Sequence, residues 1–363
     1  ALGGTGREWR ITSNGTFSAR PLPQTGGAAL LEPVRVTGAA ESATGPLHGY
    51  AAHVSATGTK TDTPIIETPQ SITVVGAEEI ETLKAQSLQD ALGYVAGVSR
   101  AEGQDRTSDS LFLRGFRGTQ GSYYRDGTLY TVNIYNGRQE LYGLERVEFL
   151  KGAASVLYGA APPGGVINTV SKRPTTEPLH ELNVEAGNFR RKQISGDFGG
   201  ALDDEGKWSY RLTALKRDSD TFIDHVPDDR TYVAPALKWQ PSDATSLTLL
   251  AEYQEDRTAY VYGLPGQGTV LPNPNGRIPR NRFTGEPGFD KFIMKRYSIG
   301  YLFEHAFTDQ FKLRNSVRYF HADSTYFSTD IWQLQADQRH TADRGAMPRW
   351  DRSSAVVADT SLQ

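Results

Sequence analysis

Residues of alternating apolar and polar character dominate the second half of the chain. From residue 179 onward, segments of roughly 9–11 residues recur in which one face is apolar and the other polar, as in strands that expose two different surfaces. The apolar positions are Leu182, Val184 and Ala186; Trp208, Tyr210, Leu212 and Ala214; Leu247, Leu249, Ala251 and Tyr253; Tyr297, Ile299, Tyr301 and Phe303; and Phe311, Leu313, Val317 and Tyr319. This pattern predicts a long series of antiparallel strands.

The polar faces and the turns favour a transmembrane barrel over a soluble sandwich. The strand that begins at Phe311 places Lys312, Arg314 and Arg318 on its second face, and a barrel with a wet interior accommodates such residues. Short turns at 203–206 and 241–243 alternate with a long segment over 256–291. Short turns at one rim and long loops at the other are typical of outer-membrane barrels.

Residues 61–178 have a different pattern, that of a globular α+β domain. Apolar residues at helical spacing predict a helix from Glu78 to Val95, with Gly97 after its end. Short apolar runs between glycine-containing turns predict strands at 71–75, 111–113, 122–125 and 146–150.

The first 60 residues contain little that could form a core. Two short strands, 8–12 and 16–19, flank Asn14-Gly15, which is a strong hairpin signal. The following Gly-, Ala-, Thr- and Ser-rich stretch is typical of a linker. Its one β-branched island, 32–38, suits either an extended linker or a strand added to a partner's sheet edge.

Composition removes several classes of protein. The 363 residues are 37% hydrophobic, with a formal charge of −3 and no cysteine. The balanced charge argues against nucleic acid as a partner, and the lack of cysteine excludes disulfide scaffolds, iron–sulfur clusters and thiolate zinc sites. No apolar run approaches the ~18 residues of a membrane helix, so an α-helical membrane protein is excluded.

Enzyme and metal motifs are incomplete. The Gly-rich stretch 159–165 lacks the Gly-Lys-Ser/Thr ending of a phosphate loop. After His180-Glu181, the position that a zinc helix needs for its second histidine holds Val184. The seven histidines show no ligand spacing, and we expect neither a catalytic residue nor a metal site.

Several motifs in the middle of the chain resemble the plug domain of TonB-dependent outer-membrane receptors. They are Leu-Glu-Arg-Val-Glu-Phe-Leu-Lys-Gly at 144–152, Pro-Gly-Gly-Val-Ile-Asn at 163–168, Thr-Lys-Thr-Asp-Thr-Pro at 59–64 and Leu-Arg-Gly-Phe at 113–116. The strongest resemblance is to hydroxamate-type siderophore receptors of the ferrichrome and ferrioxamine kind. It implies an α+β plug with a four-stranded sheet, followed by the first part, about eight strands, of a 22-stranded antiparallel transmembrane β-barrel. The 363 − 178 = 185 residues after the plug allow about eight strands, so we expect a fragment that lacks most of the barrel.

The resemblance also divides the chain. Residues 1–23 resemble the tail of a periplasmic signalling domain, 24–55 form a linker, 56–178 the plug, and 179–363 the beginning of the barrel. The linker contains a segment at 45–53 that is similar in position to a switch helix. Its β-branched island resembles a TonB box: Glu32, Pro33, Val34, Arg35, Val36, Thr37 and Gly38.

The function implied by the resemblance is import rather than catalysis. A ferric siderophore binds outside the plug, TonB pairs with the box, and the barrel meets outer-membrane lipid, with the N-terminal segment in the periplasm. No cofactor is implied, because iron is carried only within the siderophore. Two alternatives stay open: a siderophore-sensing transducer acting on an inner-membrane anti-sigma regulator, and a soluble β-rich binding or carbohydrate-active protein.

Site residues are implied by position only. The resemblance assigns ligand contacts to Tyr135, Thr119, Gln120, Arg100, Arg106, Tyr260 and Tyr262. The Arg100 and Arg106 assignments are alternatives for one arginine. Gly263 stands where ferrichrome receptors of the family have a tryptophan, which argues against ferrichrome itself as the ligand. Arg114 and Arg146 are assigned to a lock between plug and barrel, with glutamate partners expected in later strands.

Overall fold

The structure is a computed structural model that describes residues 7–11, 17–21, 41–101, 105–118, 120–130, 132–308, 310–335 and 341–363. The chain divides into two compact units, Ala1–Glu41 and Ser42–Gln363. In the first unit, β1 (Arg7–Ile11) and β2 (Phe17–Pro21) form the antiparallel hairpin that Asn14-Gly15 predicts. The proposed TonB box at 32–38 lies outside the described residues.

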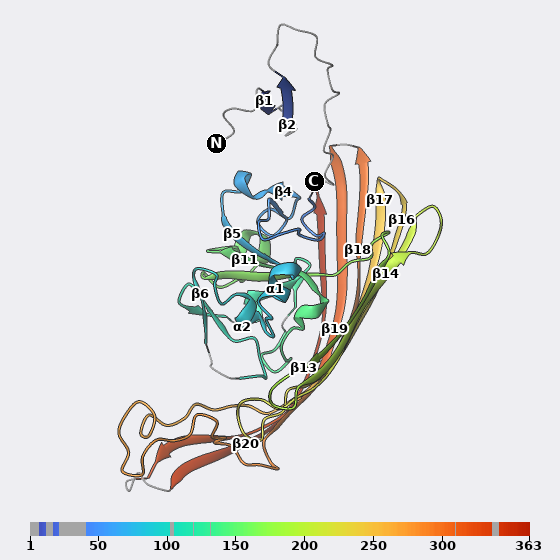
Figure 1. Cartoon of the computed structure of the whole chain (residues 1–363). Coiled ribbons are helices and arrows are strands. Elements are labelled where there is room, and N and C mark those ends of the chain that lie inside the picture. Colours follow the sequence, from blue (N-terminus) through green and yellow to red (C-terminus); the bar gives the residue numbers. More distant parts are fainter. Residues whose placement is uncertain are drawn as a thin grey trace. The chain divides into compact units, whose positions relative to one another are not determined.

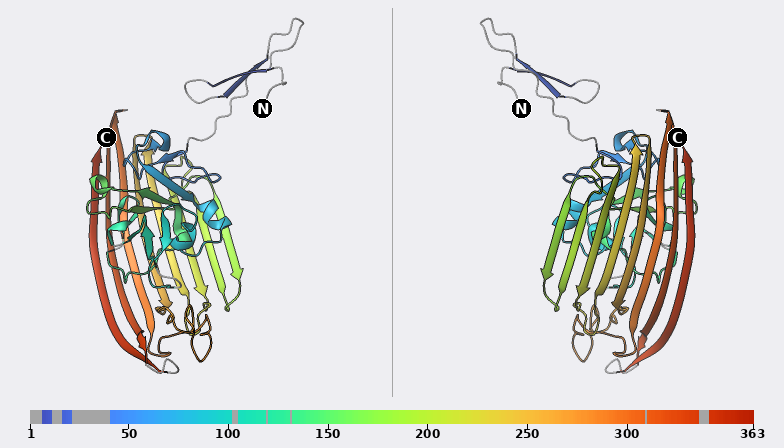
Figure 2. Two further views of the ribbon diagram at one scale, coloured as in Figure 1. Left: turned by 90° about the vertical axis from the view of Figure 1, so that its left-hand side faces the viewer. Right: turned by 90° about the vertical axis from the view of Figure 1, so that its right-hand side faces the viewer.

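The second unit contains the plug and a long curved sheet (Figures 1 and 2). A five-stranded sheet in the order β10-β9-β12-β11-β5 forms the centre of the plug, and β9 and β12 run parallel while the other pairs are antiparallel. The expected sheet had four strands. Three of the predicted strands, at 71–75, 122–125 and 146–150, belong to this sheet, whereas the one at 111–113 lies in a separate three-stranded sheet, and β10 and β12 were not predicted. The strands are β5 (Ser71–Gly76), β9 (Tyr123–Arg125), β10 (Thr128–Leu129), β11 (Leu144–Lys151) and β12 (Gly165–Ser171).

The two faces of this sheet are covered differently. Val147 and Phe149 of β11 pack on one face against the helices α1 (Ala77–Thr82) and α2 (Leu88–Ala91). Leu150 packs on the other face, toward α3 (Ser155–Tyr158). Because neighbouring residues of a strand point in opposite directions, β11 is buried along nearly its whole length.

The single helix predicted over 78–95 is wrong, since two helices occupy that stretch. Lys84 has a positive φ of 51°, which ends the first helical segment. Ser87 then caps α2 by accepting a hydrogen bond from the backbone N–H of Asp90 at 3.2 Å. Among the described residues, no helix has both the length and the apolar character needed to span a membrane.

Short elements complete the plug and hold its loops. Residues 45–53, which resemble a switch helix by position, form bends and irregular chain without a helix. The remaining elements are β3 (Val54–Ser55), β4 (Thr63–Pro64), β6 (Val98–Arg100), β7 (Leu111–Leu113), β8 (Phe116–Arg117) and the 3₁₀ turns η1 (Ile65–Glu67), η2 (Gln120–Ser122) and η3 (Leu141–Gly143).

Eight antiparallel strands in chain order form the curved sheet, which we call the wall (Figure 2). Neighbouring strands in the sequence are neighbours in space throughout, as in an up-and-down barrel. The strands are β13 (Leu179–Ala186), β14 (Lys192–Ala201), β15 (Trp208–Asp218), β16 (Asp229–Ser242), β17 (Thr245–Thr258), β18 (Lys291–Thr308), β19 (Phe311–Leu334) and β20 (Ala342–Leu362). The last three are much longer than the predicted 9–11 residues.

The face of the wall that points away from the plug is apolar and exposed. Val184 is 77% exposed and Ile299 is 61% exposed. Near the short turns, Trp208 and Trp239 stack with ring centroids 6.0 Å apart. An exposed apolar band with aromatic residues beside the turns is the surface that a strand sheet presents to lipid.

Candidate ligand-binding site

A tight turn at the apex of the plug positions Tyr135. The Asn133 side chain accepts a hydrogen bond from the Tyr135 backbone N–H at 3.0 Å, and the Asn136 side chain accepts one from the Asn133 N–H at 2.8 Å. Asn136 also donates to Ser353 Oγ of β20 at 3.2 Å. Gly137 has a φ of +81°, a backbone conformation that favours glycine, and it lies against the end of the Met294 side chain of β18. The turn is therefore fixed against the wall.

Around this turn, rings from the plug and the wall form an aromatic cluster, defined as Tyr135, Tyr260, Tyr262, Phe292 and Tyr326. The Tyr135 and Tyr326 centroids lie 5.0 Å apart in an edge-to-face arrangement. Tyr260 lies 5.7 Å from Tyr326 and 6.2 Å from Tyr262. Phe292 is 6.1 Å from Tyr326 and is fully buried, whereas Tyr262 is 39% exposed. The cluster therefore runs from the buried ring of Phe292 on β18 to the partly exposed ring of Tyr262.

Two features extend the cluster outward. The Arg349 guanidinium of β20 lies 4.2 Å from the Tyr135 ring centroid, a cation–π geometry. Beside Tyr262, the segment Gly263–Gln267 and the exposed Trp332 of β19 line a cavity of about 460 Å³. A site of aromatic walls with a few polar groups suits a small polar complex that presents both carbon and oxygen surface.

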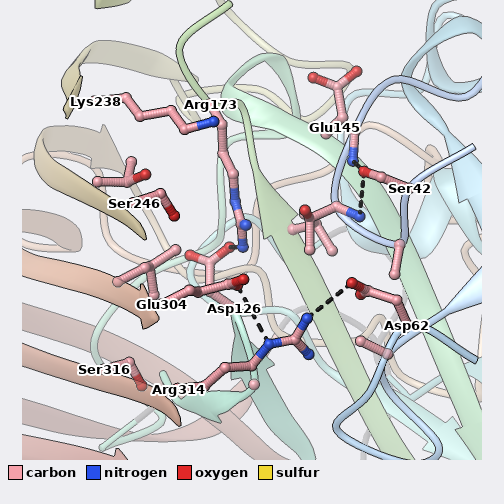
Figure 3. A pocket seen from close by; sticks show the side chains of 18 of the residues that line it. Ser42, Asp62, Asp126, Glu145, Arg173, Lys238, Ser246, Glu304, Arg314 and Ser316 are labelled. Atoms are coloured by element: carbon pink, nitrogen blue, oxygen red, sulfur yellow. Dashed lines mark hydrogen bonds and ion pairs between the residues drawn. The ribbon is translucent and has the colours of Figure 1, made fainter. Parts of the chain in front are cut away.

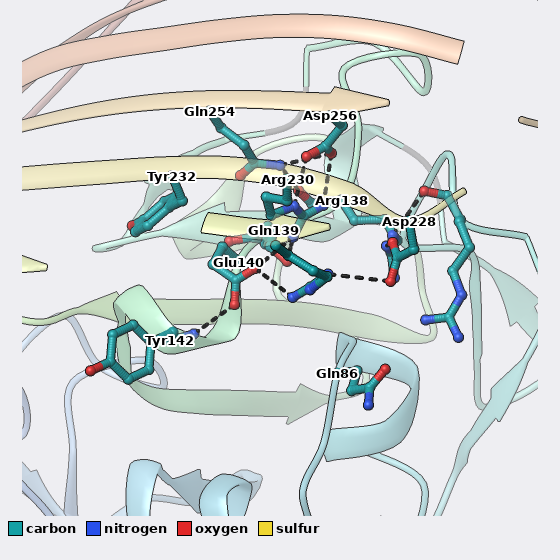
Figure 4. Close-up of polar contacts among 12 residues, drawn as sticks. Gln86, Arg138, Gln139, Glu140, Tyr142, Asp228, Arg230, Tyr232, Gln254 and Asp256 are labelled. Atoms are coloured by element: carbon teal, nitrogen blue, oxygen red, sulfur yellow. Dashed lines mark hydrogen bonds and ion pairs between the residues drawn. The ribbon is translucent and has the colours of Figure 1, made fainter. Parts of the chain in front are cut away.

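Below the cluster, buried charges join the plug to the wall (Figure 4). We call this set the ionic network: Arg125, Arg138, Glu140, Arg217, Asp228, Arg230, Glu252, Asp256 and Arg296. Arg138 of the plug pairs with Asp228 at 2.7 Å, and Arg230 of β16 pairs with Glu140 of the plug at 2.9 Å. Each of these side chains is less than one-tenth exposed. Buried charges require such pairing, so the network fixes the register of plug and wall.

The plug carboxylates of this region differ in pKa. Burial alone would raise the pKa of the Glu140 carboxyl, but the charges of Arg230 and Arg217 outweigh it and hold the pKa below its usual range. Asp109 is also buried, and desolvation affects its pKa more than the hydrogen bond that the Gln139 N–H donates at 2.7 Å and the charges of the nearby arginines. It raises the pKa of Asp109 to about 6.

The structure places the other sequence-predicted ligand residues as follows. Arg106 lies beside the network, since its carbonyl accepts a hydrogen bond from Arg138 Nε at 2.8 Å. Burial and then the Arg138 charge lower the pKa of Arg106. Arg100 instead pairs with Asp90 of α2 at 2.6 Å. Gln120 begins the 3₁₀ turn η2, and Thr119 lies outside the described residues.

The two residues assigned to a plug–barrel lock have different surroundings. Arg146 is fully buried, and its guanidinium donates to the carbonyls of Ser42, Gly45 and Val54 at 2.7, 2.9 and 3.0 Å. In the described structure it thus holds the segment that leads into the plug. Arg114 is exposed, with a φ of +51°. The charges that join plug and wall in this structure are those of the ionic network together with further pairs such as Arg211–Glu145 and Arg318–Asp126.

Sequence reasoning missed Tyr326, Phe292, Arg349 and Trp332. Tyr326 lies on the plug-facing side of β19, where Phe320, Ala322 and Ser324 are also buried. Continuing the predicted strand beyond Tyr319 would have placed Tyr326 on the same face as Arg318, which points to the plug. Among the described residues, no group of three or more histidine, aspartate or glutamate side chains could hold a metal ion.

Comparison with known proteins gives the class. Residues 64–166 match the family model described as TonB-dependent Receptor Plug Domain. Two solved structures share the fold. The first is the ferric-catecholate import receptor Fiu of E. coli K12 in its open form, with a TM-score of 0.73 and 24% identity over 84% of this chain and 47% of that chain. The second is the ferripyoverdine receptor of the outer membrane of Pseudomonas aeruginosa, with a TM-score of 0.77 and 21% identity over 99% of this chain and 46% of that chain. The chain therefore carries the plug domain of a TonB-dependent receptor, followed by eight strands of an unclosed barrel, and the expected fold class is confirmed. Both parts indicate an outer-membrane protein.

Among curated proteins, the chain is similar to named receptors and transporters. It is 42% identical over 309 residues to the ferrichrome outer membrane transporter/phage receptor of Escherichia coli K12, covering 84% of this chain and 39% of the relative. It is 32% identical over 311 residues to the ferrioxamine B receptor of Salmonella typhimurium SL1344, covering 84% and 44%. It is 36% identical over 316 residues to the metal-pseudopaline receptor of Pseudomonas aeruginosa PAO1, covering 86% and 44%. The chain thus spans about two fifths of the length of these relatives.

Proposed function

We propose that the protein binds a ferric siderophore of the hydroxamate class at the aromatic cluster and imports it across the outer membrane. The observation that carries this proposal is that Tyr135 from the plug meets Tyr326 of β19, which in turn contacts Tyr260 of the loop between β17 and β18. A ligand on this cluster contacts both parts at once, so its binding can be transmitted into the plug. The relatives named for ferrichrome and ferrioxamine support the hydroxamate class.

The chemistry of the cluster also supports this ligand class. A ferric trihydroxamate presents a carbon surface with oxygen atoms and little net charge. Tyrosine rings offer apolar faces, and their hydroxyls and the Arg349 guanidinium offer hydrogen-bond donors. Arg106, Thr119 and Gln120 are proposed to add further donors from the plug. Iron enters and leaves within the ligand, and no resident cofactor is needed.

Coupling to TonB is the second part of the proposal. The segment 32–38 is proposed to pair, as an added strand, with TonB, which draws on the inner membrane's proton gradient. Arg146 supports this arrangement because it holds the second half of the linker against the plug, through Ser42 and Gly45. A change in the plug can therefore reach the linker through one buried side chain.

The test is a fluorescence titration of the receptor in detergent with ferrichrome, ferrioxamine B and a ferric catecholate. We expect saturable quenching by a hydroxamate and none by the catecholate. Tyr135→Ala should weaken binding about tenfold or more, the loss typical of a buried aromatic contact. Tyr94→Ala changes a tyrosine of the plug that is 87% exposed and outside the cluster, and it should have no effect. Binding of the catecholate alone would refute the hydroxamate class.

A second candidate function is siderophore sensing. The ferripyoverdine receptor structure covers 99% of this chain, including the β1–β2 hairpin region, whereas the Fiu structure covers 84%. The hairpin is proposed to belong to a periplasmic signalling domain that acts on an anti-sigma regulator. Deleting residues 1–21 should abolish a siderophore-dependent transcriptional response while leaving uptake intact. An unchanged response would refute it.

A further inference from the structure

The last residues of the plug loop before β7 lie directly beside the turn that carries Tyr135. The Arg138 side chain donates from Nε to the carbonyl of Arg106 at 2.8 Å. The backbone N–H of the next residue, Gln139, donates to the Asp109 carboxylate at 2.7 Å. Because Arg138 and Gln139 follow Tyr135 within four residues, these two bonds fix Arg106 next to the turn that brings Tyr135 into the aromatic cluster.

The Arg106 guanidinium has no counter-ion of its own. Within the residues that the structure describes, its side chain makes no hydrogen bond and no ion pair. The carboxylates that act most strongly on its charge are those of Asp228 and Asp90. Asp228 already pairs with Arg138 at 2.7 Å. Asp90 already pairs with Arg100 at 2.6 Å, so neither carboxylate is available to Arg106.

The ionic network beside Arg106 has no free negative charge either. It contains five arginines and four carboxylates. The buried Asp109 carboxyl, whose pKa of about 6 leaves it mostly ionised at neutral pH, adds a fifth negative charge. The positive and negative charges of this region therefore balance without Arg106, and the charge of Arg106 is in excess.

Other arginines between the plug and the wall have carboxylate partners. A polar cavity of about 520 Å³ separates the two parts away from the aromatic cluster (Figure 3). In it, Arg314 pairs with Asp62 at 2.8 Å, and Arg173 lies 3.6 Å from Asp126. Arg106 departs from this pattern, in the one part of the plug where we propose that a ligand binds.

The arginine that lies over Tyr135 is also neutralised. Arg349 of β20 donates two hydrogen bonds to the Asp351 carboxylate, from Nε at 2.5 Å and from Nη2 at 2.9 Å. Its guanidinium therefore offers the aromatic cluster a cation–π contact but little net charge. Of these two guanidinium groups, only that of Arg106 is left for an anion.

The burial of Arg106 makes an incoming anion favourable. Removing water from a charge without supplying a counter-charge raises its free energy. Burial accordingly lowers the pKa of the Arg106 guanidinium, and the charge of Arg138 lowers it further. Arginine nevertheless remains protonated at neutral pH, and its planar N–H groups match the two oxygens of a carboxylate. A bound carboxylate would supply the counter-charge that the described residues do not.

We propose that Arg106 selects a siderophore that carries a negatively charged substituent of the carboxylate class, separate from its iron-binding groups. The inference rests on the proposed import function and narrows its substrate class. The rings of the aromatic cluster contact the carbon surface of the ferric complex, and Arg106 binds the anionic substituent. A neutral ferric hydroxamate of the same shape should bind more weakly.

The experiment compares three forms of one ferric hydroxamate by fluorescence titration of the receptor in detergent at neutral pH. They are ferrioxamine B with its positively charged terminal amine, its neutral N-acetyl form, and its N-succinyl form, which ends in a carboxylate. We expect the wild type to bind the succinyl form about tenfold more tightly than the acetyl form, the effect of one charge-assisted hydrogen bond, and the amine form most weakly. Equal Kd values for the acetyl and succinyl forms would overturn the proposal.

Two variants assign the preference to Arg106. The readout is the ratio of the acetyl and succinyl Kd values within each variant, so a general loss of affinity cancels. Arg106→Gln should bring the ratio to about one, whereas Arg106→Lys keeps the charge and should retain part of the preference. Arg114→Gln removes an exposed arginine of the plug and should keep the full preference. An undiminished preference in Arg106→Gln would refute the role of Arg106.

Failure of the proposed function gives a different result. If none of the three forms binds to the wild type, the hydroxamate class itself is wrong. If all three bind equally well, the hydroxamate class stands and the selection of an anionic substituent is wrong.

Discussion

Glu252→Gln tests whether the ionic network holds the plug in the wall. One carboxylate oxygen of Glu252 on β17 accepts a charge-assisted hydrogen bond from Arg125 of the plug. Its other oxygen lies 3.3 Å from Arg296 and accepts a hydrogen bond from Tyr130 Oη at 2.5 Å. The Arg125 and Glu252 side chains are only 4% and 5% exposed. The substitution keeps the shape of the side chain and one hydrogen-bond acceptor. It removes the negative charge that faces the buried guanidinium groups of Arg125 and Arg296.

The magnitude follows from this burial. Removing one partner of a buried ion pair costs about 3–5 kcal/mol, because the remaining charge stays desolvated and unpaired. Since the amide preserves some hydrogen bonding, about 3 kcal/mol is expected. With an unfolding entropy of about 2.1 cal/mol/K per residue, that corresponds to a fall of roughly 4–5 °C in Tm for a unit of this size.

The assay is differential scanning calorimetry of the receptor in detergent. Glu255→Gln is the matched control, because Glu255 lies three residues further along the same strand and pairs with the exposed Arg257. A pair that solvent reaches contributes about 0–1 kcal/mol, so this control should lower Tm by about 1.5 °C or less. In Arg125→Met/Glu252→Gln both charges are gone, and part of the lost stability should return. Equal melting of Glu252→Gln and Glu255→Gln would refute the reasoning.

Three further predictions address the plug. Arg146→Met leaves the carbonyls of Ser42, Gly45 and Val54 without the guanidinium that donates to them. A protease should therefore cut within residues 42–54 several-fold faster than it does in Arg114→Met, which changes an exposed arginine. Equal rates of cutting would show that Arg146 does not hold this segment. Because the pKa of Asp109 is raised to about 6, its contribution to stability is complete below about pH 4 and is lost as the pH rises through 6. Asp109→Asn should therefore raise the free energy of unfolding at pH 7 by up to about 3 kcal/mol and have little effect at pH 4, which thermal melting at both pH values would check. In Gly165→Ala, the new Cβ would lie 2.2 Å from the carbonyl oxygen of Leu150 in β11, at a φ of +128°. The substitution should lower the free energy of unfolding by about 2–5 kcal/mol. Its Tm should lie far below that of Gly115→Ala, whose Cβ would meet open space.

The repeating pattern of the wall made its strands predictable, whereas their partners could not be read from it. Arg314 and Arg318 were recognised as polar-face cations lining a wet interior. In the structure Arg318 is buried and pairs with Asp126 of the plug at 2.7 Å, a residue 192 positions away. Periodicity gives the face on which a side chain lies, but long-range pairing depends on tertiary packing.

Inside the plug, local signals competed with one another. The helical spacing from Glu78 to Val95 was real, yet the capping tendency of Ser87 and the turn at Lys84 divided it. At the candidate site, Tyr135 and Tyr260 were assigned by matching short motifs by position, and the structure brings both into the aromatic cluster, while their contact with a ligand stays a prediction. Tyr326 was missed because the predicted strand stopped too early.

The position of β5 in the plug sheet has a mechanical consequence. β5 is the edge strand nearest to the N-terminus, and it pairs with β11 alone, from Ser71 to Gly76. Tension applied from the N-terminal side therefore reaches a strand that can be peeled away by breaking one ladder. The central pair β11–β12 bears load only after that step. Such an order of rupture lets part of the domain extend under pull while the remainder keeps its fold and can serve as the template on which the strand re-forms.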